Sequence, residues 1–211
     1  MKSIKNKLRL IKTIVYLVVG AGLLVAPLLH NEIWLSQIHK QTTPLVQDLP
    51  KDVIQATVQR TIDGDTLVLT NGEHVRLIGI DTPELHDKNT RLRAFALRAK
   101  ALSTLLTENK TVYLQKDVSE TDRYGRLLRY VYIPQNQTLP KTSSLKSYIK
   151  TLFSKGSTQK STTKYIMLNR LLVYTGYATA KTYPPDVQFQ ELFLDDQKHA
   201  QTHNLGLWKP N

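Results

Sequence analysis

The chain has 211 residues, 41% of them hydrophobic, with 29 lysines and arginines against 17 aspartates and glutamates. It contains no cysteine, which excludes disulfide frameworks, zinc–thiolate sites, iron–sulfur clusters and thiol nucleophiles. The apolar content argues against a wholly disordered protein and against a polytopic membrane protein. The length fits one globular domain with additional segments.

The positive charge is concentrated in two segments. Residues 1–31 contain five cations and no acid, and residues 135–164 contain six lysines and no acid. Removing these eleven cations from the net charge of +12 leaves +1 for the rest of the chain. The high net charge therefore does not by itself predict that the rest of the chain binds nucleic acid.

Residues 1–31 are predicted to be a signal-anchor or a signal peptide. Five cations precede the uncharged, largely apolar run Thr13–Asn31, which is close to the roughly 20 residues that cross a hydrocarbon core. We favour an uncleaved transmembrane helix because the best small-residue pair for cleavage, Gly20 with Gly22, falls inside the apolar run. The preceding cations predict a cytoplasmic N-terminus with the rest of the chain outside the membrane, or secreted if the segment is cleaved.

Residues 32–52 are expected to form a stalk or linker, because Gln37–Lys51 is polar and contains Pro44 and Pro50. Residues 53–211 are predicted to form the globular domain. Short alternating apolar runs predict strands at 54–58, 67–69 and 75–77.

Asn71-Gly72 predicts a type I′ hairpin turn between the last two of these strands. Apolar residues spaced four, three and four apart then predict an amphipathic helix over 92–106.

The second half of the domain is predicted to contain two more strands and two more helices. The strands are expected at 112–115 and 127–133. A helix is expected at 166–174, with Gly176 as its C-cap, and a last helix from near Asp186 to before Gly206. The order of elements predicts an α+β fold, a small partly open barrel with helices packed against it.

The lysine-rich insert 135–164 is expected to be a surface loop, because its serine, threonine and lysine residues cannot bury much area. It is either a solvated excursion or a contact for phosphates or anionic lipids.

Three stretches combine charged residues with glycine or proline: Ile62–Thr66, Arg76–Glu84 and Thr121–Arg126. Two carboxylates and a backbone carbonyl from the first two could converge on one hard cation, and two arginines could clamp a phosphodiester. On a regular strand Arg76 and Asp81 would face opposite ways, and a bend near Gly79 would change that. Each stretch taken alone also fits an ordinary turn, helix entry or solvated loop.

Together these stretches resemble the staphylococcal nuclease family. The resemblance covers about Val53 to Trp208, and Asn169, Gly176 and Gly206-Leu207-Trp208 also match in the family's order. It implies a five-stranded oligonucleotide-binding (OB) type β-barrel with three helices. It also implies that the protein hydrolyses DNA and RNA with calcium and leaves 3′-phosphate ends.

The resemblance also implies a role for each matching residue. Asp65 and Asp81 would bind calcium through their side chains, and Thr82 would bind it through its backbone carbonyl.

The catalytic residues implied in the same way are Arg76, Glu84 and Arg126. The two arginines would bind the scissile phosphate, and Glu84 would be the general base or would orient the attacking water. Tyr183 is a candidate for stacking on a base, with Lys181 nearby in the sequence, whereas the family's second stacking tyrosine has no counterpart in this segment.

The sequence thus predicts a monomeric, calcium-dependent nuclease that acts on DNA, RNA or both outside the cytoplasmic membrane. One alternative is a non-catalytic module that binds single-stranded nucleic acid at the cell surface. Another is a cell-surface interaction protein in which the barrel is only a scaffold.

Overall fold

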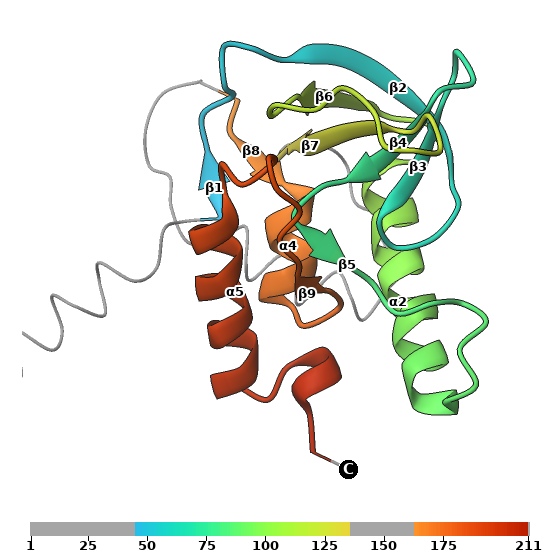
Figure 1. Ribbon diagram of the computed structural model, residues 1–211, viewed down its shortest axis with the longest axis vertical. Helices are drawn as coiled ribbons and strands as arrows, with labels where there is room; N and C mark the ends of the chain where they lie inside the picture. The colour runs from blue at the N-terminus through green and yellow to red at the C-terminus, as the bar shows by residue number, and fades with distance from the viewer. Residues whose placement is uncertain (1–44, 136–162, 211) are drawn as a thin grey trace, which may run out of the picture. The chain divides into compact units, whose positions relative to one another are not determined.

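Five strands close into a small barrel in the computed structural model, which describes residues 45–135 and 163–210. The strands of the barrel are β2 (Ile54–Thr61), β3 (Thr66–Leu69), β4 (His74–Leu77), β6 (Thr111–Gln115) and β7 (Leu127–Pro134). β3 lies between β2 and β4, and β4 pairs in parallel with β7. β6 pairs with both β7 and β2, so the barrel is closed rather than partly open (Figure 1).

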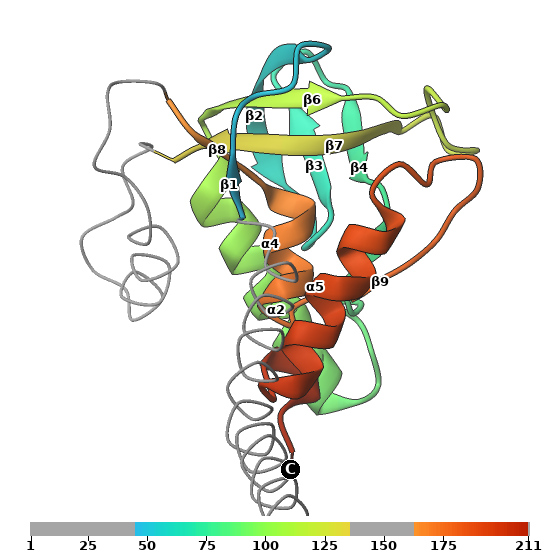
Figure 2. The ribbon, with the colours of Figure 1, turned by 90° about the vertical axis from the view of Figure 1, so that its left-hand side faces the viewer.

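Three helices lie at one end of this barrel (Figure 2). They are α2 (Thr90–Thr107), α4 (Leu168–Tyr174) and α5 (Gln190–Thr202), and a short 3-10 turn, η1, follows at Gly206–Trp208. The predicted α+β class, with a five-stranded OB-type barrel and three helices, is confirmed. All described residues belong to one compact unit, Pro44–Asn211.

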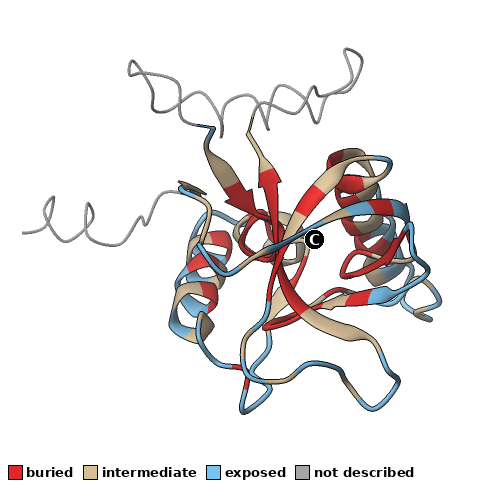
Figure 3. Ribbon diagram, turned by 90° about the horizontal axis from the view of Figure 1, so that it is seen from above, coloured by how far each residue is buried: buried red, intermediate tan, exposed pale blue. Residues whose placement is uncertain are grey.

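The apolar core fills the barrel and continues between the barrel and the helices, as Figure 3 shows by burial. Alternation along the strands places one side chain in two on the inner face. Along α2, Phe95, Ala99, Leu102 and Leu106 are all buried, which is the spacing that the sequence predicted. A buried ion pair joins α4 to α5, with Arg170 Nε 2.8 Å from Asp196 Oδ2.

The β3–β4 hairpin forms where it was predicted, but its turn is not type I′. Gly72 has a φ of +89°, whereas Asn71 does not have a positive φ. The Asn71 side-chain oxygen instead accepts the N–H of Glu73 at 3.1 Å. This local hydrogen bond stabilises a wider loop between the two strands.

Two helix starts differ from the prediction. Tyr165–Met167 forms strand β8, which pairs with β7, so α4 begins at Leu168 rather than at Ile166. Strand pairing here outweighs the helical spacing of the apolar residues. α5 begins at Gln190 rather than near Asp186, because the Asp186 carboxylate accepts two N–H groups from another loop and does not cap the helix.

The folded unit includes part of the segment expected to be a linker. Val46–Gln47 forms strand β1, which pairs with β8, and Leu45 and Leu49 pack against the core. The two end residues of the insert lie side by side, since the N–H of Gln135 donates to the carbonyl of Lys164 at 2.8 Å.

The expected anchor at 1–31 and residues 136–162 of the insert lie outside the described residues. Within the two described ranges, no helix is both long and apolar enough to span a membrane.

Candidate active site

A bend after β4 brings Arg76 and Asp81 to the same side of the chain. Gly79 has a φ of +79°, and a Cβ at this position would lie only 2.2 Å from the ring of Phe193. The chain then enters β5 (Ile80–Asp81), which pairs with β9 (Thr179–Ala180). Arg76 Nη2 consequently lies 3.0 Å from Asp81 Oδ1, so the conditional prediction of a bend near Gly79 is confirmed.

Asp65, the residue that precedes β3, joins the same cluster. Its Oδ2 lies 2.8 Å from Arg76 Nη1 and accepts the N–H and the hydroxyl of Thr82, each at 2.8 Å. Burial raises the pKa of the Asp65 carboxyl, and the Arg76 guanidinium partly offsets that effect. Asp65 is thus buried with its negative charge directed at Arg76 and Thr82.

Close packing against α2 holds the turn that precedes Asp65. The Ser103 hydroxyl donates to the carbonyl of Gly64 at 2.6 Å. A Cβ at Gly64 would lie 2.7 Å from side-chain atoms of both Ala99 and Thr82. The absence of a side chain at Gly64 therefore allows α2 to lie against the turn that carries Asp65.

The donors at this cluster suit a hard cation. Asp65 and Asp81 bind the same guanidinium, so their carboxylates lie close together with a net charge of −1 when Arg76 is included. Carboxylate and carbonyl oxygens are the ligands that calcium and magnesium prefer. In the part of the chain that the structure describes, no group of three or more His, Cys, Asp or Glu is placed to hold a metal. Water would have to complete the coordination of an ion bound here.

Arg126 is presented by a hairpin that precedes β7. Its Nε and Nη2 each lie 2.7 Å from Asp122 Oδ2, and Asp122 Oδ1 accepts the N–H groups of Tyr124 and Arg126. Burial alone would raise the pKa of Asp122, but the hydrogen bonds from Arg126 and the backbone outweigh it and lower the pKa. Asp122 is therefore a charged anchor for Arg126.

Arg76 and Arg126 line one cavity of about 540 Å³. Tyr183 lines the same cavity, and Lys181 lies beside it, with its Nζ 5.8 Å from the centre of the Tyr183 ring and 3.5 Å from Asp81 Oδ2. The structure thus gathers both predicted phosphate clamps and the predicted stacking residue around one space. Arg76 links that space to the carboxylate cluster.

Comparison with known proteins identifies the family. A family model described as a staphylococcal nuclease homologue matches residues 74–210. A thermonuclease of Staphylococcus intermedius is 31% identical over 155 residues, which cover 72% of this chain and 74% of that protein.

The chain belongs to the staphylococcal nuclease family.

Two further relatives agree with this membership. A micrococcal nuclease of Shigella flexneri is 34% identical over 161 residues, covering 73% of this chain and 74% of that protein. The endonuclease YncB of Bacillus subtilis (strain 168) is 27% identical over 162 residues, covering 75% of this chain and 63% of that protein. The enzyme class predicted from the sequence, a nuclease-type hydrolase, is confirmed at this level.

One predicted catalytic residue of this nuclease fold, Glu84, does not line the cavity. Glu84 is exposed in the loop between β5 and α2 and is not among the residues that line the cavity. The carbonyl of Glu84 accepts the N–H of Asp87 at 3.2 Å. The Glu84 side chain is therefore open to water in the loop that follows Thr82.

Tyr124 is a further residue of the site, and it was not predicted from the sequence. This tyrosine is 68% exposed and lines the same cavity as Tyr183. The guanidinium carbons of Arg123 and Arg126 lie 4.7 Å and 5.5 Å from the centre of its ring. Its position between two arginines in the 121–126 stretch was the signal that could have revealed it.

Proposed function

We propose that the protein is a calcium-dependent nuclease that hydrolyses phosphodiester bonds of DNA, RNA or both and leaves 3′-phosphate ends. The observation that carries the proposal is the cavity that Arg76 and Arg126 line together, with Arg76 also bound to Asp65 and Asp81. Two guanidinium groups can hold a phosphodiester through paired, charge-assisted hydrogen bonds. The family's nuclease-named relatives support the same reaction.

The residues suggest a division of roles in the reaction. Arg76 and Arg126 would orient the phosphate and stabilise the charge that develops on its oxygens. Glu84, exposed at the loop after β5, would orient or deprotonate the attacking water. Attack at phosphorus with loss of the 5′ oxygen would leave the phosphate on the 3′ side.

Asp65, Asp81 and the Thr82 carbonyl would hold the calcium ion. When bound, the ion would supply positive charge that polarises the phosphodiester.

The aromatic side chains at the cavity suit a nucleic-acid substrate. Tyr183 is 44% exposed and Tyr124 is 68% exposed, so each has ring surface available for a base. Base–aromatic stacking contributes about 1–3 kcal/mol per base and tolerates any sequence. We infer that the two tyrosines position bases next to the bound phosphate.

The first test is cleavage of single-stranded DNA by wild-type protein and by Arg126→Ala and Glu84→Gln. We expect calcium-dependent cleavage by the wild type, and a loss of kcat of about 100-fold or more in each variant, since a preorganised charge is removed from the transition state. Folding should persist, which circular dichroism would check. Arg60→Ala is the matched control, because Arg60 is exposed on β2 and does not line the cavity.

The result would contradict the proposal if both variants cleaved at the wild-type rate. Tight binding of DNA without cleavage by the wild type, with calcium or with a chelator, would favour the non-catalytic binding module.

We also propose that the nuclease acts outside the cytoplasmic membrane, held by residues 1–31 or released after their cleavage. The support is the sequence: cations followed by an uncharged apolar run of membrane-spanning length. Protease added to intact cells should then degrade the cell-associated nuclease. A domain protected until the cells are lysed would overturn the proposed location.

A further inference from the structure

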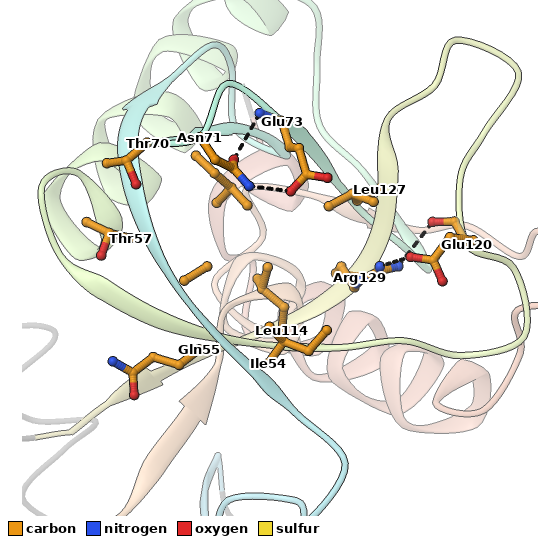
Figure 4. A pocket seen from close by; sticks show the side chains of 12 residues that line it. Ile54, Gln55, Thr57, Thr70, Asn71, Glu73, Leu114, Glu120, Leu127 and Arg129 are labelled. Atoms are coloured by element: carbon orange, nitrogen blue, oxygen red, sulfur yellow. Dashed lines mark hydrogen bonds and ion pairs between the residues drawn. The ribbon is translucent and has the colours of Figure 1, made fainter.

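Arg129 is a charged residue on the inner face of the barrel. It lies on β7 in alternation with Leu127, Val131 and Ile133, and successive odd positions of a strand share one face. Only 3% of Arg129 is exposed. Together with residues of β2, β3 and β6 it lines a second cavity of about 460 Å³ at the barrel mouth (Figure 4).

The Arg129 guanidinium binds both the backbone and the side chain of Glu120. Nη1 donates to the Glu120 carbonyl at 3.0 Å and to the Leu128 carbonyl at 2.9 Å. Nη2 forms an ion pair with the Glu120 carboxylate, as the dashed lines in Figure 4 show. Two arms of a planar group therefore fix the position and the orientation of Glu120.

Glu120 is at the base of the hairpin that carries Arg126. Its carbonyl also accepts the N–H of Leu128 at 3.0 Å, and Thr121 pairs with Leu127 one step further along. The N–H of Asp122 then donates to the carbonyl of Arg126, and the Asp122 carboxylate accepts from the Arg126 side chain. A continuous series of contacts thus runs from Arg129 inside the barrel to Arg126 in the active-site cavity.

An arginine at this position has a poor structural rationale. Its Nε is buried and has no acceptor among the described residues, and an unsatisfied buried donor costs free energy. Glu120, in contrast, has a side chain that is 56% exposed, so it would remain hydrated without its partner. An apolar side chain at position 129 would match Val131 and Ile133 and leave no buried charge unpaired.

We propose that Arg129 is a positioning residue for phosphodiester hydrolysis. It fixes the base of the hairpin from inside the barrel and so holds Arg126 at the distance from Arg76 that the phosphate requires. The inference rests on the proposed nuclease activity and on the role of Arg126 in it. β4 and β7 are paired at Arg76 and Leu128, so the same strand that carries Arg129 also sets the position of Arg76.

The test compares Arg129→Met with the wild type in stability and in steady-state kinetics on a short single-stranded DNA. We expect a melting temperature equal to or above that of the wild type, with kcat lower by about 10- to 100-fold, because a small misplacement of a transition-state contact is costly. Arg129→Lys keeps a charged donor but lacks the two parallel N–H groups of a guanidinium. Its kcat should lie between those of the wild type and Arg129→Met. A residue needed only for folding would lower the melting temperature and the kcat together.

Lys116→Gln is the matched control. Lys116 Nζ lies 3.4 Å from the same Glu120 carboxylate in an exposed pair, and its loss leaves both arms from Arg129 in place. We expect its kcat to equal that of the wild type. Glu120→Gln removes the ion pair but keeps an oxygen that can accept from the guanidinium, so it should fold and show a reduced kcat even if Arg129→Met does not fold.

A double-variant comparison shows whether Arg129 acts through Arg126. Arg129→Met should lower kcat in the wild type but change it less than twofold when Arg126 is already alanine. An equal loss in both backgrounds, or no loss in the wild type, would overturn the inference. If instead Arg126→Ala itself has wild-type activity, the proposed function fails and not the positioning step alone.

Discussion

At the scale of single residues, the site depends on one arginine shared between two carboxylates. Arg76 is 13% exposed in its side chain and lies within 3.0 Å of both Asp65 and Asp81. Asp65 also accepts two hydrogen bonds from Thr82. The Arg76–Asp81 and Asp65–Thr82 contacts cross the bend at Gly79, so the conformation of that glycine decides whether these two contacts form.

Gly79→Ala should therefore be strongly destabilising. A side chain at a φ of +79° is strained, and its Cβ would overlap the ring of Phe193. We expect the free energy of unfolding to fall by about 2 kcal/mol or more, measured by urea denaturation.

Gly125→Ala provides the control for Gly79→Ala. Gly125 also has a φ of +79°, but nothing lies within 4 Å of its added Cβ. The loss there should be about 1 kcal/mol, from backbone strain alone. Equal losses at the two glycines would show that the contact with Phe193 has no energetic weight.

At the scale of elements, the interface between α4 and α5 combines a buried ion pair with stacked rings. Arg170 binds Asp196 across the interface, and the Tyr174 ring stacks on His199 with 3.7 Å between ring centres. The ring of His203, the residue that follows α5, stacks on His199 with 4.2 Å between ring centres. Burial lowers the pKa of His199 below its usual value, and the adjacent His203 lowers it further.

The stability of the protein should fall as the pH drops below about 6.5, the pKa of an unfolded histidine. Because the folded state lowers the pKa of His199, the unfolded state binds the proton more readily, so acid favours unfolding. This contribution is fully present above pH 6.5 and is lost as the pH falls toward the folded-state pKa. Melting temperatures measured between pH 8 and pH 5 would show the slope.

His199→Gln should flatten that slope, whereas His86→Gln, at an exposed loop position, should leave it unchanged. A slope that survives the loss of His199 would assign the pH dependence to other groups.

At the scale of the whole molecule, the closed barrel is extended by two short strands. β8 pairs with β7 on one side and with β1 on the other. Lys164 adds an ion pair to Asp48 at 2.7 Å, although both side chains are substantially exposed and the pair contributes little. The apolar contacts of Leu45, Val46 and Leu49 with the core are the main contribution of this segment.

A protein that begins at Val53 should thus be less stable than one that begins at Pro44. The loss of β1 and its partly buried apolar side chains should lower the free energy of unfolding by about 2 kcal/mol. Both proteins retain the carboxylate cluster and the cavity, so both should cleave DNA at similar rates at low temperature. Identical urea midpoints would show that residues 45–52 do not contribute to the fold.

The sequence by itself determined the class of fold and the family, and it predicted three of the residues that line the cavity, Arg76, Arg126 and Tyr183. Alternation and helical spacing are local properties, so they predicted the main strands and α2 without knowledge of the partners. The three charged stretches occur in the same order as in the family. Their acids and arginines are the residue types that metal binding and phosphate binding require, so together they identified the family.

Only the tertiary structure decided which residues share a space. Ile166 reads as helix in sequence but forms a strand with Ile133 and Val46, because pairing with distant strands outweighs local preference. The sequence predicts that the last helix begins near Asp186, yet the Asp186 carboxylate binds a loop 67 residues away. The buried charge of Arg129 and its hold on Glu120 have no local signature either. These contacts form only when the chain is folded, so the spacing of residue types along the chain does not predict them.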